Sequence, residues 1–261
     1  MAICKVVDQQ SVGRDLFALT FTSPVDLRSA GAYWPGQFLH IRVSDSFDFL
    51  LRRPLSLCEA DPERGLLKVV YRASGEGTRR LTRVRPGDSL DVLGPLGRGF
   101  PLHTGDHSTL LIAGGIGVPP MVQLARALRE AGTRAHAVIG FQMVDQVILV
   151  KELTDAGAKV SVTTDDGSFG AHGLVTDLLT EGLCAGVDRY YACGPTPMLR
   201  AVQGVMQARR VPGYLSLEER MGCGIGICVG CVHSIRREGQ VSHLKTCKEG
   251  PVFPAQEVVF Q

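Results

Sequence analysis

The chain has 261 residues and a formal net charge of +2, with 44% hydrophobic and 21% charged residues. This length allows two domains of ordinary size and a small additional segment, and the composition is that of a globular protein. The balanced charge, without a run of Lys or Arg, excludes nucleic acid as a predicted partner, and no stretch approaches the roughly 20 apolar residues of a membrane-spanning helix.

Residues 1–103 are predicted to form short β-strands separated by turns. The clearest strands are 15–22, 37–43 and 66–72, which are rich in β-branched and aromatic residues. Turns rich in Pro, Gly and Asp separate the strands, as at 85–88. Many short strands at this spacing predict an antiparallel barrel or sandwich.

From about residue 108 the pattern becomes strand, loop and helix. An apolar strand at 109–113 is followed by a glycine-rich loop and then by a helix predicted from Pro119 to Leu128, with proline where a first helical turn tolerates it. Further strands are predicted at 135–140, 159–163 and 189–192. This alternation predicts a parallel sheet covered by helices.

Glycine-rich loops follow two of these strands, Gly114–Gly117 and Cys193–Pro195. Such loops allow a close approach of the backbone to a pyrophosphate, which a helix N-terminus attracts. The first loop lacks the G-x-G-x-x-G fingerprint, and a single glycine turn can be no more than a turn. Loops that follow parallel strands meet at one edge of the sheet, so we expect both loops, with the segment 163–168, to meet at a ligand site.

Four cysteines near the C-terminus have the spacing C-x4-C-x2-C followed, fifteen residues later, by a fourth cysteine: Cys223, Cys228, Cys231 and Cys247. This is the plant-type pattern for a 2Fe–2S cluster, and a tetrahedral zinc site is the alternative. The other four cysteines are expected to be buried. Since four are predicted ligands and the start MAICKVVDQQ has no export signal, we expect a cytoplasmic location.

Four motifs occur in an order that resembles the ferredoxin–NADP reductase superfamily: Arg53-Pro54-Leu55-Ser56, Gly75-Glu76-Gly77-Thr78, Gly114-Gly115-Ile116-Gly117 and Cys193-Gly194-Pro195. The cysteine motif, preceded by Leu217-Glu218-Glu219-Arg220-Met221, narrows the resemblance. The chain looks like the electron-transfer subunits of NAD-dependent (class 1B) dihydroorotate dehydrogenases.

The resemblance implies a six-stranded antiparallel FAD-binding barrel at 1–103, a parallel-sheet α/β nicotinamide-binding domain at 104–213 and a small 2Fe–2S segment at 214–261. It assigns Cys193 as the catalytic residue beside the nicotinamide and Cys223, Cys228, Cys231 and Cys247 as cluster ligands. The residues that it assigns to FAD or NAD are Arg53, Pro54, Leu55, Ser56, Val70, Tyr71, Arg72, Gly75, Gly77, Thr78, Gly114, Gly115, Gly117, Gly194 and Pro195.

Within that set, the resemblance places Arg53 on a flavin phosphate and Ser56 near the flavin N5. Many relatives carry an aromatic residue where this chain has Leu55, so the group that stacks on the flavin is left open. The segment 140–147 has no Lys or Arg to pair with a 2′-phosphate but does contain Asp145, which favours NADH over NADPH. Asp145 could instead cap the next helix.

The function implied is that of the NAD-reducing flavoprotein subunit of an oxidoreductase complex in pyrimidine (UMP) biosynthesis. Electrons are expected to pass from dihydroorotate to FMN on a partner catalytic subunit, then through 2Fe–2S and FAD to NAD, in a heterotetramer. One alternative is the FAD/2Fe–2S subunit of an NADH–ferredoxin transhydrogenase, sulfide dehydrogenase or hydrogenase-type complex. Another is a non-catalytic, zinc-stabilised interaction module. His233 and His243 lie near the cysteines, which leaves a mixed ligand set open.

Overall fold

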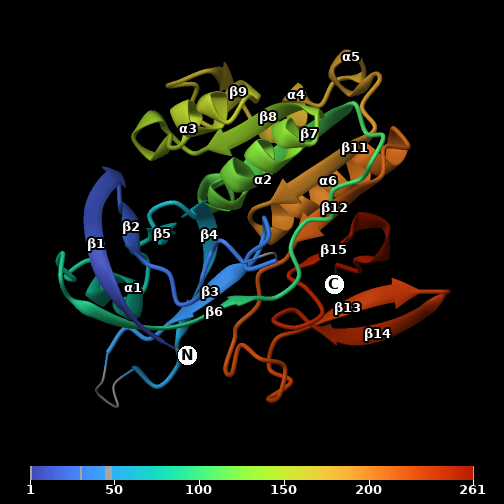
Figure 1. Cartoon of the computed structure of the whole chain (residues 1–261). Helices are drawn as coiled ribbons and strands as arrows, with labels where there is room; N and C mark the ends of the chain where they lie inside the picture. The colour runs from blue at the N-terminus through green and yellow to red at the C-terminus, as the bar shows by residue number, and fades with distance from the viewer. Residues whose placement is uncertain (1, 30, 45–48, 261) are drawn as a thin grey trace.

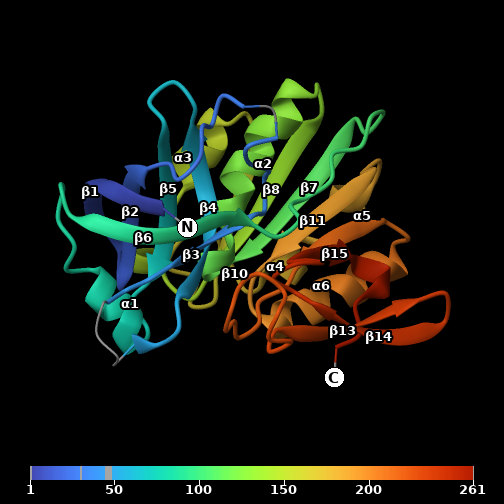
Figure 2. The ribbon, with the colours of Figure 1, turned by 60° about the horizontal axis from the view of Figure 1, so that its bottom comes forward.

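The computed structural model describes residues 2–29, 31–44 and 49–260. An antiparallel barrel lies beside an α/β domain, and the C-terminal segment packs against the α/β domain, with the loop after residue 216 next to the barrel (Figures 1 and 2). Among the described residues, no helix has the length and apolar character needed to cross a membrane.

The barrel is closed by six antiparallel strands in the order β1-β2-β5-β4-β3-β6, which confirms the predicted fold of this part. The strands are β1 (Ala2–Gly13), β2 (Leu16–Thr22), β3 (Phe38–Ile41), β4 (Arg53–Asp61), β5 (Leu66–Arg72) and β6 (Ser89–Leu96). The short helix α1 (Glu76–Leu81) lies between β5 and β6. Apolar side chains that alternate along these strands fill the interior, among them Leu19, Phe21, Leu39 and Ile41.

The α/β domain contains a seven-stranded sheet in the order β10-β9-β8-β7-β11-β12-β15. Its strands are β7 (Ser108–Gly114), β8 (Arg134–Phe141), β9 (Lys159–Thr164), β10 (Ala171–His172), β11 (Arg189–Cys193), β12 (Gly213–Ser216) and β15 (Val252–Pro254). Its helices are α2 (Pro119–Glu130), α3 (Val150–Asp155), α4 (Val175–Leu178), α5 (Glu181–Cys184) and α6 (Thr196–Ala208). Residues of α2 and α3 cover one face and residues of α4, α5 and α6 cover the other, so the predicted helix-covered sheet is confirmed.

Helix α2 joins the two domains into one core. Its residues Met121, Val122 and Leu124 are fully buried between the sheet and the outer face of the barrel, where they share a cluster with Ala18 and Val70. Burial of this kind stabilises by about 25 cal/mol per Å² of apolar surface, so the interface resists separation of the domains.

Polar contacts flank the same interface. The carboxylate of Glu59 on β4 pairs with Arg126 on α2 and, at 3.0 Å, with Lys68 on β5. The Gln123 side-chain oxygen accepts a hydrogen bond from the N–H of Ala60 at 3.3 Å. The orientation of the barrel relative to the sheet is therefore set by directional contacts as well as by apolar packing.

The C-terminal segment contains more regular structure than the sequence predicted. Strand β12 crosses the predicted boundary at 213/214, and β15 pairs with it in antiparallel register. The hairpin of β13 (Val232–Arg237) and β14 (Gln240–Lys245) lies between them in sequence. Strands of three or four residues are too short to show an alternating pattern, which is why the sequence did not reveal β12 and β15.

Candidate functional site

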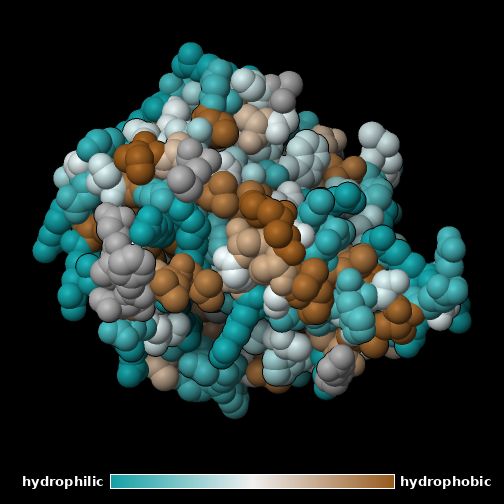
Figure 3. Space-filling view, turned by 90° about the horizontal axis from the view of Figure 1, so that it is seen from below, coloured by the Kyte–Doolittle hydropathy of each residue, from teal (hydrophilic) through white to brown (hydrophobic). Residues whose placement is uncertain are grey.

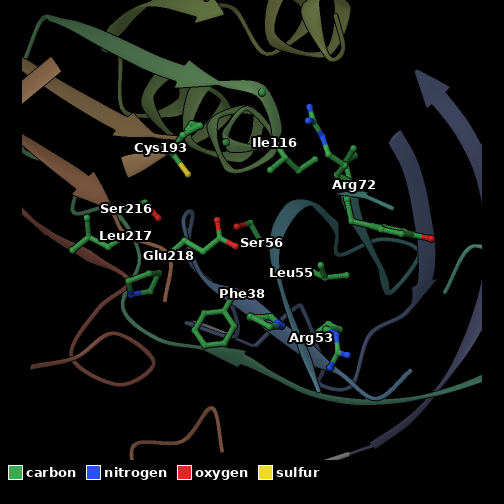
Figure 4. Close-up of a pocket in the computed structure, with 18 of the residues that line it drawn as sticks. Phe38, Arg53, Leu55, Ser56, Arg72, Ile116, Cys193, Ser216, Leu217 and Glu218 are labelled. Carbon is green, nitrogen blue, oxygen red and sulfur yellow. The ribbon is translucent and has the colours of Figure 1, made fainter. Parts of the chain in front are cut away.

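A cavity of about 490 Å³ opens where the barrel, the carboxyl edge of the sheet and the start of the C-terminal segment meet (Figure 4). All four sequence motifs converge on it. The residues predicted to bind cofactors that line it are Arg53, Pro54, Leu55, Ser56, Val70, Tyr71, Arg72, Thr78, Gly114, Gly115, Gly117, Gly194 and Pro195, and Cys193, predicted as the catalytic residue, lines it too. Gly75 and Gly77 lie just behind this wall, beside Thr78 and Arg53.

One end of the cavity is built around Arg53. Its guanidinium lies directly on the backbone of Gly77, since a Cβ built on that glycine would lie 2.6 Å from Nη2. The hydroxyl of Thr78 accepts a hydrogen bond from the N–H of Gly75 at 3.1 Å, which orders the first turn of α1. A fixed guanidinium beside the N–H groups of a helical first turn fits a phosphate.

A second guanidinium, Arg72, lies at the end of β5 next to the glycine loop of the other domain. A Cβ built on Gly115 would lie 3.7 Å from Arg72 Nη2, and this Nη2 donates a long hydrogen bond of 3.4 Å to Gln146. Its Nε is buried and has no hydrogen-bond partner among the described residues. Figure 4 shows Arg72 beside Ile116, on the opposite side of the cavity from Arg53. The cavity thus presents two separate anion-binding groups.

The two glycine loops of the α/β domain touch each other through their backbones. A Cβ on Gly117 would lie 2.2 Å from the carbonyl oxygen of Cys193 and 2.7 Å from the N–H nitrogen of Gly194. Only glycine permits this approach, and it brings together the loops that follow β7 and β11. The segment after β9 reaches the same edge, where Ser168 accepts a hydrogen bond from the N–H of Val144 at 2.8 Å.

The thiol of Cys193 stays protonated at neutral pH. Burial, with a smaller contribution from the carboxylate of Glu218, raises its pKa to about 12, and a hydrogen bond with Ser216 only partly opposes this. Cys193 can therefore contact and orient a bound ring, but it does not supply a thiolate. In Figure 4 the carboxylate of Glu218 points across the cavity toward Ser56.

The four predicted ligand cysteines lie on the loop between β12 and β13 and on the turn that follows β14. Three backbone N–H groups, those of Ile225, Ile227 and Cys228, point at the Sγ of Cys223 at 3.3 to 3.5 Å. These donors, Cys228 first, lower the pKa of Cys223 to about 6 and so favour its thiolate. The donor set, four thiols with converging N–H groups, fits an iron–sulfur cluster.

The thiols lie as two pairs. Cys223 contacts Cys228, and Cys231 contacts Cys247, whose N–H donates to the Sγ of Cys231 at 3.4 Å. Both a 2Fe–2S cluster and a zinc ion take four thiolates, and the spacing of the cysteines favours the cluster. Within the described part of the chain, no three His, Cys, Asp or Glu side chains form a group that could hold a single metal ion.

Phe38 on β3 connects the cavity with the cysteines. Its ring, 3% exposed, lines the cavity and packs in one cluster with Met221, Cys231 and Cys247. Met221 lines the cavity as well, so both side chains connect the wall of the cavity with the cysteine segment.

Three family models match consecutive parts of the chain. They describe an oxidoreductase FAD-binding domain at residues 3–100, an oxidoreductase NAD-binding domain at 111–204 and the iron–sulfur cluster binding domain of dihydroorotate dehydrogenase B at 218–259. The electron transfer subunit of dihydroorotate dehydrogenase B (NAD(+)) from Shouchella clausii is 44% identical over 97% of this chain and 96% of its own length. The chain belongs to the dihydroorotate dehydrogenase B electron transfer subunit family. The subunit from Geobacillus kaustophilus, at 48% identity over 86% of both chains, gives the same result.

Solved structures support this assignment at the level of the fold. A chain of an NADH-dependent reduced ferredoxin–NADP oxidoreductase superimposes with a TM-score of 0.86 at 32% identity, covering 99% of this chain and 90% of that one. Phthalate dioxygenase reductase has a TM-score of 0.65 at 21% identity over 95% of this chain and 77% of its own, and so shows the shared fold.

Several residues that this member of the dihydroorotate dehydrogenase B family brings to its sites were not predicted from sequence. Glu218 and Phe38 line the cavity, and Arg14 of the barrel lies 3.6 Å from Asp145. Asp145 lies within the 3-10 helix η3 (Val144–Gln146) and does not cap a helix. In each case the contact joins segments far apart in the sequence, so no local sequence pattern indicates it.

Proposed function

We propose that this chain transfers electrons from the FMN of a dihydroorotate dehydrogenase catalytic subunit to NAD, in the biosynthesis of pyrimidines and UMP. The observation that carries the proposal is the single cavity that brings a flavin-type wall and a nucleotide-type glycine loop together and touches the cysteine segment through Phe38. When bound, FAD exchanges two electrons with a nicotinamide and single electrons with a 2Fe–2S cluster.

The residues of the cavity divide between the two nucleotides. Arg53, with the first turn of α1, would hold the pyrophosphate of FAD. Arg72, with Gly115 and Gly117, would hold the pyrophosphate of NAD, because this guanidinium faces the glycine loop. Cys193 closes the side of the cavity opposite Ser56, and the aliphatic Leu55 leaves room for a flat ring to lie between the two domains.

The cysteine segment would present its cluster to the catalytic partner. Ile225, Ile227 and Val229 lie on the cysteine loop and are 45%, 76% and 61% exposed. Figure 3, which looks at this side from below, shows apolar side chains in a band across the face. Exposed apolar groups at this density are typical of a protein interface. Two catalytic and two electron-transfer chains would form a heterotetramer in the cytoplasm.

The alternative partner is a complex like the NADH-dependent reduced ferredoxin–NADP oxidoreductase, whose chain shares this fold over nearly its whole length. Sequence identity favours dihydroorotate oxidation, since electron transfer subunits of dihydroorotate dehydrogenase B are 40–48% identical to this chain, whereas the chain of that oxidoreductase is 32% identical.

Replacing Cys228 with Ser in the intact complex tests the path. We expect the coupled reaction between dihydroorotate and NAD to be lost, while NADH oxidation by ferricyanide through FAD continues. Cys184→Ser is the matched control, since Cys184 is buried at the end of α5, away from the cysteine loop. Retention of the coupled reaction in Cys228→Ser, with iron absent, would contradict the path.

A further inference from the structure

His40 is a buried polar side chain that the proposed function does not explain. It is 0% exposed, and neither of its ring nitrogens has a hydrogen-bond partner among the described residues. A buried polar group without a partner costs about 1–3 kcal/mol, so an apolar residue of similar volume would be more stable at this place. Such a group calls for a specific role.

The position of His40 on β3 directs it toward the cysteine segment. Leu39 and Ile41 point into the barrel core, and side chains alternate along a strand, so Phe38 and His40 share the outer face. Phe38 packs against Cys231 and Cys247. His40 instead contacts the loop at Cys223, the first of the four predicted ligands, and at Gly224.

The contact with Gly224 is direct. A Cβ built on this glycine would lie 2.4 Å from Nδ1 of His40, and the glycine has a φ of +72°, which side chains rarely adopt. The backbones of Arg52 and Cys223 are the polar neighbours of the ring, but neither offers a hydrogen bond of good geometry. An imidazole N–H therefore lies against the loop that carries the first cluster ligand, with its hydrogen-bonding capacity unused.

We propose that His40 is a positioning residue for the iron–sulfur cluster: its ring N–H donates a hydrogen bond to the Cys223 side of the cysteine segment when the cluster is bound. On the outer face of β3, Phe38 packs against Cys231 and Cys247, and His40 lies against Cys223 and Gly224. The inference rests on the proposed function only in requiring that the four cysteines hold a 2Fe–2S cluster. Hydrogen bonds near the sulfurs are among the factors that set the reduction potential of such clusters.

The experiment compares His40→Leu and His40→Asn in the intact complex. Leucine fills the volume without a donor, whereas the asparagine amide keeps an N–H near the position of Nδ1. His136→Leu is the control, because His136 lies on β8 and bonds Ser161 at 2.9 Å, in the other domain. Iron and FAD content, the electron paramagnetic resonance spectrum of the reduced cluster and its midpoint potential are measured with a chemical reductant and mediators.

We expect His40→Leu to keep its FAD and to show an altered cluster spectrum with a more negative potential, or to lose iron. His40→Asn should lie closer to the native protein in each measurement. A native spectrum and potential in His40→Leu would overturn the inference, as would equal changes in both variants, which would assign His40 a packing role. These readouts need no dihydroorotate, so a failure of the proposed function, seen when the native complex does not pass electrons from dihydroorotate to NAD, is a separate result.

Discussion

Replacing Arg72 with glutamine is expected to weaken NADH binding by about 10- to 100-fold while leaving FAD in place. A hydrogen bond to a charged group contributes about 1.5–3 kcal/mol, and each 1.4 kcal/mol is tenfold in affinity. The bond that Arg72 gives up on binding NADH is weak, because its contact with Gln146 is 3.4 Å long and its Nε has no partner among the described residues. Arg72 therefore loses little when it binds a pyrophosphate. Replacing it should weaken NADH binding by most of the range of about 1.5–3 kcal/mol.

The assay is the KM for NADH with ferricyanide as acceptor, together with the ratio of FAD to protein from visible absorbance. Arg53→Gln is the informative counterpart, since it should lose FAD. Arg129→Gln is the matched control, because its guanidinium donates to the carbonyl of Asp155 at 2.9 Å, far from the cavity. The assignment is refuted if Arg72→Gln releases FAD, or if the KM for NADH stays at the native value.

Two further outcomes concern the meeting of the glycine loops. Gly117→Ala should lower stability by about 1–3 kcal/mol and weaken NADH binding, because the new Cβ would meet the carbonyl oxygen of Cys193 at 2.2 Å. Gly204→Ala, a helical glycine with open space around it, is its control in thermal unfolding and NADH titration, and equal behaviour of the two would contradict the contact. For Cys193→Ser, the pH–rate profile of NADH oxidation between about pH 6 and 9 should run parallel to the native one. Since burial raises the pKa of Cys193 to about 12, its thiolate forms only above that range, and an inflection near pH 8 in the native protein alone would argue against this.

The order of the domains and the presence of an iron–sulfur segment could be predicted because their signals are local. The barrel strands are bounded by turn residues. At Gly114–Pro119 the end of a strand, a glycine-rich loop and a proline that starts a helix follow each other within six residues. The spacing of the cysteines depends only on how a short loop wraps a cluster. Such features can be recognised without knowing how the rest of the chain folds.

Contacts across domains could not be predicted in the same way. Phe38 and His40 look in sequence like part of an ordinary strand, and their role depends on where the loop after β12 returns. Arg14 reaches Asp145 because the turn after β1 packs against the segment after β8, a contact that no local pattern within 140–147 predicts. Glu218 follows a strand of four residues, which carries no periodic signal.

Electron transfer from dihydroorotate to NAD is best measured on the native complex, isolated anaerobically from its own cells through a tag on this chain. Dihydroorotate is added, and the visible absorbance of flavin and cluster is followed before and after addition of NAD. We expect dihydroorotate to bleach the visible absorbance and NAD to reverse the bleaching, with the catalytic subunit present in the purified complex. Bleaching by NADH but not by dihydroorotate would contradict the assigned partner, while leaving the FAD, NAD and iron–sulfur assignments in place.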